Sequence, residues 1–259
     1  MAGVNKVLGA GKLYWEQENA SGDLDGSEVL FAETPSFTLT INTERVQDDN
    51  SDGAIAERDL DIPTKVERVT AFTTKDISSS ILALFVLGGE ATVTQSSTPA
   101  VAEPVGDAVQ GEYMQLGKSV NVTGVRGVTA VVIKVLAATM VLDTDYTLDA
   151  ALGRIFIIVG GGITDGDAIL ADFTPTANTR KQITTDQLGS KTGALRFVAD
   201  NTAGDNKDAY IPKLTLSPSG DLAWKSRDTV QELPFEGTIG TRTLSGVDLP
   251  QLYIDGRPA

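Results

Sequence analysis

The chain contains neither histidine nor cysteine among its 259 residues. Without cysteine it can form no disulfide, and without both residue types it lacks the usual ligands of a structural zinc ion. The fold must therefore be held by packing and hydrogen bonding, and the length allows one large β domain or two smaller ones. The same absence removes histidine-based triads, cysteine nucleophiles and thiol redox chemistry. It favours a structural or binding role over catalysis.

The net charge of −14, with a pI near 4.4, sets a second limit. A surface that binds nucleic acid or anionic lipid is usually basic, so this charge argues against both partners. No stretch reaches 18 consecutive apolar residues, and the N-terminal segment has no apolar core of a signal peptide. We therefore expect no transmembrane helix and synthesis in a cytoplasm.

Most of the chain is predicted to form strands. Phe37, Leu39 and Ile41 alternate with small polar residues, which places the apolar side chains on one face of a sheet. Further strands are predicted at 155–159, near Leu195 and Phe197, at 211–216 and at 229–235. Pro234 indicates an edge or a bulge in the last of these. The pattern predicts a mainly β fold, a β-sandwich or barrel.

One segment, about 76–88, is predicted to be the helix that flanks the β core. Asp76 is a good N-cap, and the apolar residues that follow have a spacing that suits a helix packed on a core. Gly88 and Gly89 would end it. The β core is expected to comprise residues 1–112 and 178–259.

Composition changes after this helix. Residues 96–110 are rich in Ser, Pro and Ala, which is typical of a loop or linker. Residues 115–175 then have the turn residues and short apolar runs of a compact all-β unit, Ig-like or a meander. We interpret this unit as an insertion between the helix and the C-terminal strands.

An acidic segment carries the strongest motif. Residues 48–59 fit the calcium-loop pattern, in which Asp48, Asn50, Asp52 and Asp59 would supply side-chain oxygens, Gly53 the turn and Ala54 a carbonyl. An EF-hand needs a helix on each side, whereas the preceding TLTINT alternates as a strand and Pro63 follows. The flanks favour a long solvated hairpin loop over a calcium site.

Other motifs are weaker. Gly9 to Lys12 lacks the first glycine and the hydroxyl residue of a phosphate loop. Aspartates are numerous, but their spacing selects no catalytic pair, and turn or surface roles explain most of them. Tyr14, Trp15 and Trp224 stand in strand-like contexts and are expected to pack in a core or an interface. We therefore assign no catalytic, cofactor-binding or metal residue.

The order of the parts resembles the major tail proteins, or tail tube proteins, of long-tailed bacteriophages. A short strand at 12–17 is followed by a strand with a long acidic loop, a further strand, one helix, a β insertion and C-terminal strands. The likeness covers nearly the whole chain in layout. The segments that carry it are 34–44 (TPSFTLTINTE), 75–90 (KDISSSILALFVLGGE), 145–167 (DYTLDAALGRIFIIVGGGITDGD) and 209–228 (AYIPKLTLSPSGDLAWKSRD).

The resemblance implies a structural virion protein that assembles into hexameric rings, which stack into a tube for genome delivery. The loop 43–63 would reach the next ring, and the unit at 115–175 would face outward. The partners implied are further copies of the chain, tape-measure and tail-terminator proteins, and DNA that passes through the lumen without specific binding. Assembly would take place in the cytoplasm of a host bacterium. The residues expected to act in ring stacking are Glu44, Asp48, Asp49, Asp52, Glu57, Arg58 and Asp59.

Two other functions stay open. The first is a calcium-dependent extracellular β-rich binding or adhesion module that uses the loop 48–59. The second is a carbohydrate-active enzyme with two carboxylates, which the aromatic content of 6% disfavours because sugar clefts usually present aromatic rings.

Overall fold

The structure is a computed structural model that describes residues 6–50, 52, 55, 57–185 and 190–257. These residues form many strands and a single α-helix, so the prediction of a mainly β fold with one helix is confirmed. The chain divides into two compact units, the first made of Met1–Ala91 and Ile183–Ala259 and the second of Thr92–Gln182. Each unit has its own hydrophobic core. Among the described residues, no helix is long and apolar enough to cross a membrane.

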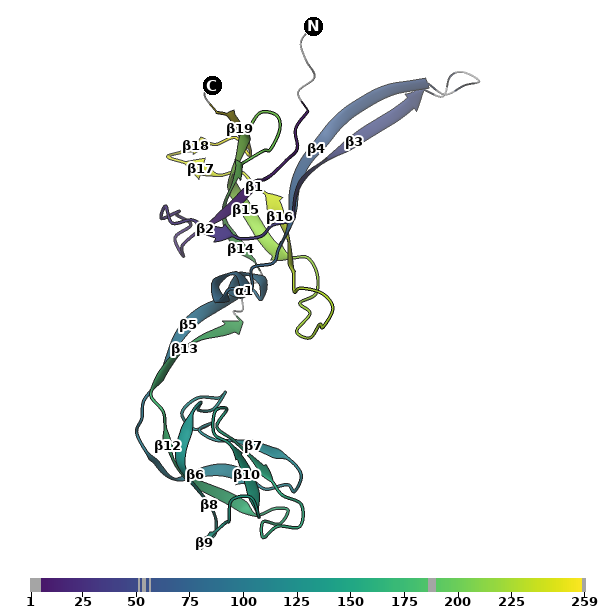
Figure 1. The fold of residues 1–259 in the computed structure, drawn as a ribbon. Coiled ribbons are helices and arrows are strands. Elements are labelled where there is room, and N and C mark those ends of the chain that lie inside the picture. The colour runs from purple at the N-terminus through teal and green to yellow at the C-terminus, as the bar shows by residue number, and fades with distance from the viewer. Residues whose placement is uncertain (1–5, 51, 53–54, 56, 186–189, 258–259) are drawn as a thin grey trace. The chain divides into compact units, whose positions relative to one another are not determined.

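The first unit is built on an eight-stranded antiparallel sheet (Figure 1). Its strand order is β2-β1-β14-β15-β16-β4-β3, and β19 pairs with β15 off this path. The strands are β1 (Gly11–Gln17), β2 (Val29–Phe31), β3 (Ser36–Asn50), β4 (Glu57–Thr74), β14 (Lys191–Ala199), β15 (Lys207–Pro218), β16 (Leu233–Ile239) and β19 (Tyr253–Gly256). A short hairpin of β17 (Thr243–Leu244) and β18 (Val247–Asp248) lies outside this sheet.

Alternation along these strands builds the first core. Leu13 and Trp15 of β1 point to the same side and are almost fully buried, as are Leu214 and Leu216 of β15. Aromatic rings from three strands and the helix meet in the same core. Their ring centroids lie 4.8 Å apart for Phe31 and Phe72, 5.3 Å for Phe72 and Phe235, and 5.5 Å for Phe235 and Phe85, the last residue of the helix. The expectation that Trp15 packs in a core is confirmed.

The strand predicted at 229–235 begins later than the sequence indicates. Residues 229–232 are not in a strand, and β16 starts at Leu233. Pro234 pairs only with Thr73 of β4, because the ladder to β15 begins at Phe235. Pro234 therefore has a paired neighbour on one side only, and a proline, which has no backbone N–H, is tolerated at such a position. Trp224 lies outside any strand and is 74% exposed, so its strand-like interpretation was wrong.

Helix α1 (Ser79–Phe85) is shorter than the predicted 76–88. Asp76 does not cap it; its Oδ1 accepts a hydrogen bond from the Ser78 backbone N–H at 2.9 Å and makes a turn before the helix. After the helix, Leu87 has a φ of 53°, and Gly88 already begins strand β5. A Cβ on Gly88 would lie 2.2 Å from the Thr184 carbonyl oxygen, so this glycine serves a close strand approach and not a helix end.

The second unit contains two sheets, with orders β6-β12-β8-β9 and β10-β11-β7. Its core is a separate cluster that includes Leu116, Ile133, Ile155, Ile169 and Phe173. The strands are β6 (Ala100–Asp107), β7 (Tyr113–Gln115), β8 (Val128–Val135), β9 (Ala138–Thr139), β10 (Tyr146–Asp149), β11 (Arg154–Ile157) and β12 (Ala168–Pro175). Strands β5 (Gly88–Gln95) and β13 (Asn178–Thr185), where the chain enters and leaves this unit, pair with each other.

The prediction that 96–110 is a linker was wrong, because most of this segment is strand β6. It pairs with β12 through two register shifts, and Ala100 and Val105 pack against the second core. The second unit therefore runs from Thr92 to Gln182, whereas the sequence placed the insertion at 115–175. Prolines and small residues are compatible with a bulged strand of this kind, which is why composition misled.

Gln95 joins the two ends of the second unit. Its Nε2 donates to the carbonyl oxygens of Arg126, at 2.5 Å, and Thr176, at 2.7 Å. Its Oε1 accepts from the Arg126 backbone N–H at 2.9 Å and from the Arg180 guanidinium at 3.3 Å. The side chain is buried, so the point where the chain enters this unit is fastened to the point where it leaves.

Candidate functional site

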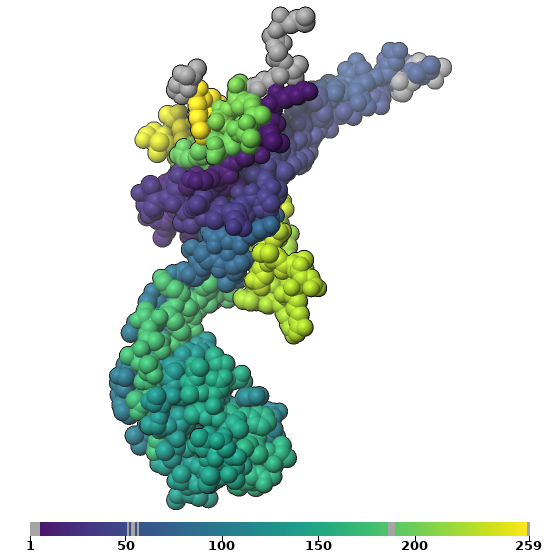
Figure 2. Space-filling model, viewed as in Figure 1, coloured from purple at the N-terminus to yellow at the C-terminus, as the bar shows by residue number. Residues whose placement is uncertain are grey.

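The most distinctive feature of the first unit is a long hairpin that stands clear of the rest of the sheet (Figures 1 and 2). We call residues 38–50 and 57–66 the arm; every residue in it is exposed. The pairing of β3 with β4 extends from Ser36 opposite Thr73 to Asn50 opposite Glu57, and the register shifts at two positions along it. At about 3.3 Å per residue, the 18-residue β4 is roughly 60 Å long.

The prediction of a loop at 43–63 was therefore wrong for all but its tip. Residues 43–50 and 57–63 are paired strands. The many aspartates, which are rare in strands, concealed an alternation that includes Val46, Leu60 and Ile62. Here the ladder hydrogen bonds and cross-strand side-chain pairs outweigh the low strand propensity of aspartate.

Aliphatic side chains lie exposed on both faces of the arm. Leu39, Ile41 and Val66 continue the face that begins at the buried Phe72, and they are 38%, 56% and 45% exposed. On the opposite face, Val46 pairs directly with Ile62, and Leu60 lies diagonally beside them. The arm therefore presents aliphatic side chains to solvent on both faces.

Ion pairs across the two strands of the arm fix its register. Arg45 contacts Asp61 at 2.6 Å, Arg58 contacts Asp49 at 3.3 Å, and Lys65 contacts Glu44 at 3.5 Å.

The hydrogen bond from Arg45 lowers the pKa of Asp61, and the negative charge of Glu44, with that of Glu67, raises the pKa of Lys65. Because these groups are exposed, each pair adds little stability, but together they oppose slippage of the strands.

The residues predicted to act in ring stacking all belong to the arm or its tip. Glu44, Asp48 and Asp49 lie in β3, Glu57, Arg58 and Asp59 lie in β4, and Asp52 lies between the strands. The structure brings Asp49 and Arg58 together as an ion pair, and Asp59 occupies the register shift beside them. Sequence reasoning selected the charged residues and missed the aliphatic ones, whose alternation was the available signal.

The calcium-loop residues are spread along the hairpin. Asp48 pairs opposite Leu60 in the ladder, and Asn50 Oδ1 accepts from the Asp52 backbone N–H at 2.9 Å. Gly53 and Ala54 lie outside the described residues. Over the part of the chain that the structure describes, no group of three His, Cys, Asp or Glu side chains could hold a metal ion.

Strand β3 is an edge of the sheet along its whole length. Within the described ranges it pairs with β4 alone, and the three-residue β2 forms the other edge. Alternate N–H and C=O groups of β3 therefore face away from β4. A long edge of this kind is a template for another strand.

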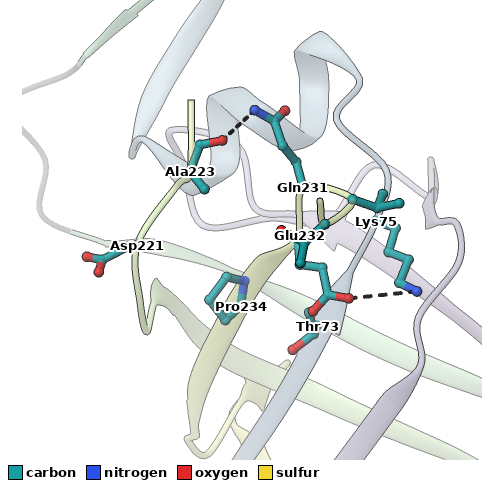
Figure 3. A pocket seen from close by; sticks show the side chains of 9 residues that line it. Thr73, Lys75, Asp221, Ala223, Gln231, Glu232 and Pro234 are labelled. Atoms are coloured by element: carbon teal, nitrogen blue, oxygen red, sulfur yellow. Dashed lines mark hydrogen bonds and ion pairs between the residues drawn. The ribbon is translucent and has the colours of Figure 1, made fainter. Parts of the chain in front are cut away.

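A hollow of the first unit has a volume of about 610 Å³ and lies beside the end of β4 (Figure 3). Lys75 Nζ lies 3.7 Å from Glu232 Oε1, and Gln231 Nε2 donates to the Ala223 carbonyl at 2.5 Å. Asp221 points away from Glu232. The hollow thus lacks the two facing carboxylates that a glycosidase would need.

Comparison with known proteins adds a family but no activity. A search of the curated proteins found no match. A family model described as "Protein of unknown function UCP028589" matches residues 6–248, which is nearly the whole chain and spans both units. The chain therefore belongs to this family of proteins of unknown function, UCP028589.

Proposed function

We propose that the protein is a structural subunit of a bacteriophage virion, a major tail protein that assembles into stacked hexameric rings and forms the tail tube. The single observation that carries the proposal is the arm, a hairpin with exposed aliphatic side chains on both faces and an unpaired edge strand. In the isolated chain this hairpin has no core to cover. In a polymer it would contact the next copy.

The ends of β4 support a head-to-tail arrangement. Its first residue, Glu57, lies at the tip of the arm, and its last residue, Thr74, leads into α1. The surface that reaches out and the surface around α1 are therefore separated by the length of the strand. A contact between two such different surfaces is heterologous, and it generates an open stack when its rotation does not close a ring.

Lateral contacts within a ring would use the two sheet edges, since strand addition satisfies edge N–H and C=O groups. The number six comes from the resemblance to tail tube proteins. Six copies of a chain with net charge −14 carry −84. Acid that faces a lumen repels DNA and lets it pass without binding. Tape-measure and tail-terminator proteins are the further partners that such a tube requires, in a virion assembled in the bacterial cytoplasm.

Negative-stain microscopy of the purified protein tests the proposal. We expect tubes or six-fold rings at high protein concentration. A monodisperse monomer under the same conditions would contradict it.

A shortened arm sharpens this test. Replacing residues 45–64 by Asn-Gly keeps Glu44 next to Lys65, which are already opposite each other in the ladder, and supplies a favourable hairpin turn. We expect this variant to melt like the unmodified protein, because the removed residues are exposed, and to form no tubes. Normal tube formation by the shortened chain would exclude a role for the arm.

A further inference from the structure

A second pocket lies at the α1 end of the first unit. Its volume is about 250 Å³, and its apolar walls are Trp15 of β1, Val29 of β2, Ala83 and Leu84 of α1, and Gly88 and Gly89 of β5. Four polar or charged residues also line it, namely Gln17, Ser80, Glu90 and Lys191. The volume is below the range of about 300–1,000 Å³ that small-molecule sites usually have. The space suits one or two aliphatic side chains of a protein partner.

Trp15 forms part of the floor of this pocket, and its side chain is 1% exposed. Its Nε1 has no hydrogen-bond partner in the described ranges, but this atom is enclosed by the chain itself and lies out of reach of a partner in the pocket. A partner that fills the pocket should therefore bring an apolar side chain.

We propose that the occupant is the arm of a second copy of this chain, which inserts one or two side chains of the aliphatic cluster Val46, Leu60 and Ile62. This inference rests on the proposed function and names the acceptor surface for the arm. The cluster is exposed, at 52%, 39% and 50%, and has no cover in its own unit.

The positions of the two surfaces agree with this pairing. The cluster lies near the tip of the arm, whereas the pocket includes α1, which follows the opposite end of β4. One chain cannot place its own arm in its own pocket at this separation. The contact must therefore join two copies, and each copy keeps one arm and one pocket for its neighbours on either side.

Cysteine cross-linking tests the contact directly, because the chain has no cysteine of its own. Val29→Cys places a thiol at the pocket, and Ile62→Cys places one on the arm. Assembled mixtures of these two variants, treated with a short bismaleimide, should give a cross-linked heterodimer. Val120→Cys, at a residue 78% exposed in the second unit, is the matched control and should give at least tenfold less product with Val29→Cys.

Assembly measurements supply a second test. Ile62→Asp should raise the critical concentration for tube formation more than tenfold, whereas Val120→Asp should leave it unchanged. Melting curves of each variant would show whether the fold is retained.

The outcomes separate the two proposals. If the unmodified protein forms no rings or tubes, the proposed function fails and this inference fails with it. If tubes form but Val29→Cys and Ile62→Cys do not cross-link, or Ile62→Asp assembles normally, another occupant fills the pocket. That result would overturn the inference and leave the tube intact.

Discussion

At the scale of single residues, one buried carboxylate accepts hydrogen bonds from two backbone segments of the second unit. Asp145 is 8% exposed, and its two carboxylate oxygens accept from the backbone N–H groups of Val141 and Gly162, each at 2.7 Å. These bonds lower the pKa of Asp145. Gly161 and Gly162 pass so close to Asp145 that neither has room for a Cβ without displacement. The sequence showed several aspartates here and could not show which one is buried.

Asp145 makes the second unit sensitive to acid. Because its pKa is lower in the folded protein, its contribution to stability is fully present above the pKa of the unfolded chain, near 4, and is lost as the pH falls through the folded value. We expect the melting temperature of the second unit to fall between pH 5 and pH 2.5, and to fall less in Asp145→Asn. Calorimetry across this range measures both.

Asp143→Asn is the matched control for this titration. Asp143 is exposed and has a φ of 63°, a conformation that asparagine also tolerates. The control should keep the acid sensitivity of the unmodified protein. An equal loss of acid sensitivity in both variants would mean that Asp145 is not the group responsible.

At the scale of elements, one glutamine holds the two ends of the second unit together. Gln95 uses its amide nitrogen and oxygen to hold Arg126, Thr176 and Arg180, and so fastens the end of β5 to the start of β13. Removing a buried group of this kind leaves several polar partners unsatisfied, each of which costs about 1–3 kcal/mol.

Gln95→Ala should therefore destabilise the second unit by at least about 2 kcal/mol and leave the first unit unchanged. Hydrogen exchange resolved by segment would show faster exchange in β6, β8 and β12 with unchanged protection in β14 and β15. Gln182→Ala is the control, because Gln182 makes one long contact, to Thr123 Oγ1 at 3.5 Å. Equal effects of the two substitutions would exclude a special role for Gln95.

Elements also show where sequence reasoning succeeded. The strand around Leu214 was predicted because Leu214 and Leu216 are buried and alternate with less buried polar residues. The start of β3 was also predicted, from the alternation of Phe37, Leu39 and Ile41, although Leu39 and Ile41 are exposed. The rest of the arm was missed because both of its faces are exposed and aspartates interrupt its apolar pattern. Strand β6 was missed because its prolines and register shifts resemble a linker. The pocket beside Trp15 is lined by residues of four strands and one helix, and no local sequence pattern predicts which distant segments meet in this way.

At the scale of the whole molecule, the two cores share no residue. The insertion leaves and re-enters the first unit through adjacent strands, and Gln95 Nε2 lies 2.7 Å from the Thr176 carbonyl oxygen. A short link can therefore replace everything between these two residues.

Replacing residues 96–175 by Gly-Gly should leave the first unit folded, because none of its core residues is removed. We expect a single cooperative melting transition and an unchanged arm. The complementary fragment 92–182 should also fold alone, since it retains the whole second core. Aggregation of the shortened chain, with loss of cooperative melting, would show that the first unit depends on the second.

The adjacency of the two connecting strands has a practical consequence. Any domain whose own ends lie a few ångströms apart could replace the insertion without lengthening or straining the chain. The first unit then becomes a display scaffold that offers one graft position per subunit, where β5 ends and β13 begins. A fluorescent protein or an antigen placed there would be repeated at every subunit of whatever array the scaffold forms.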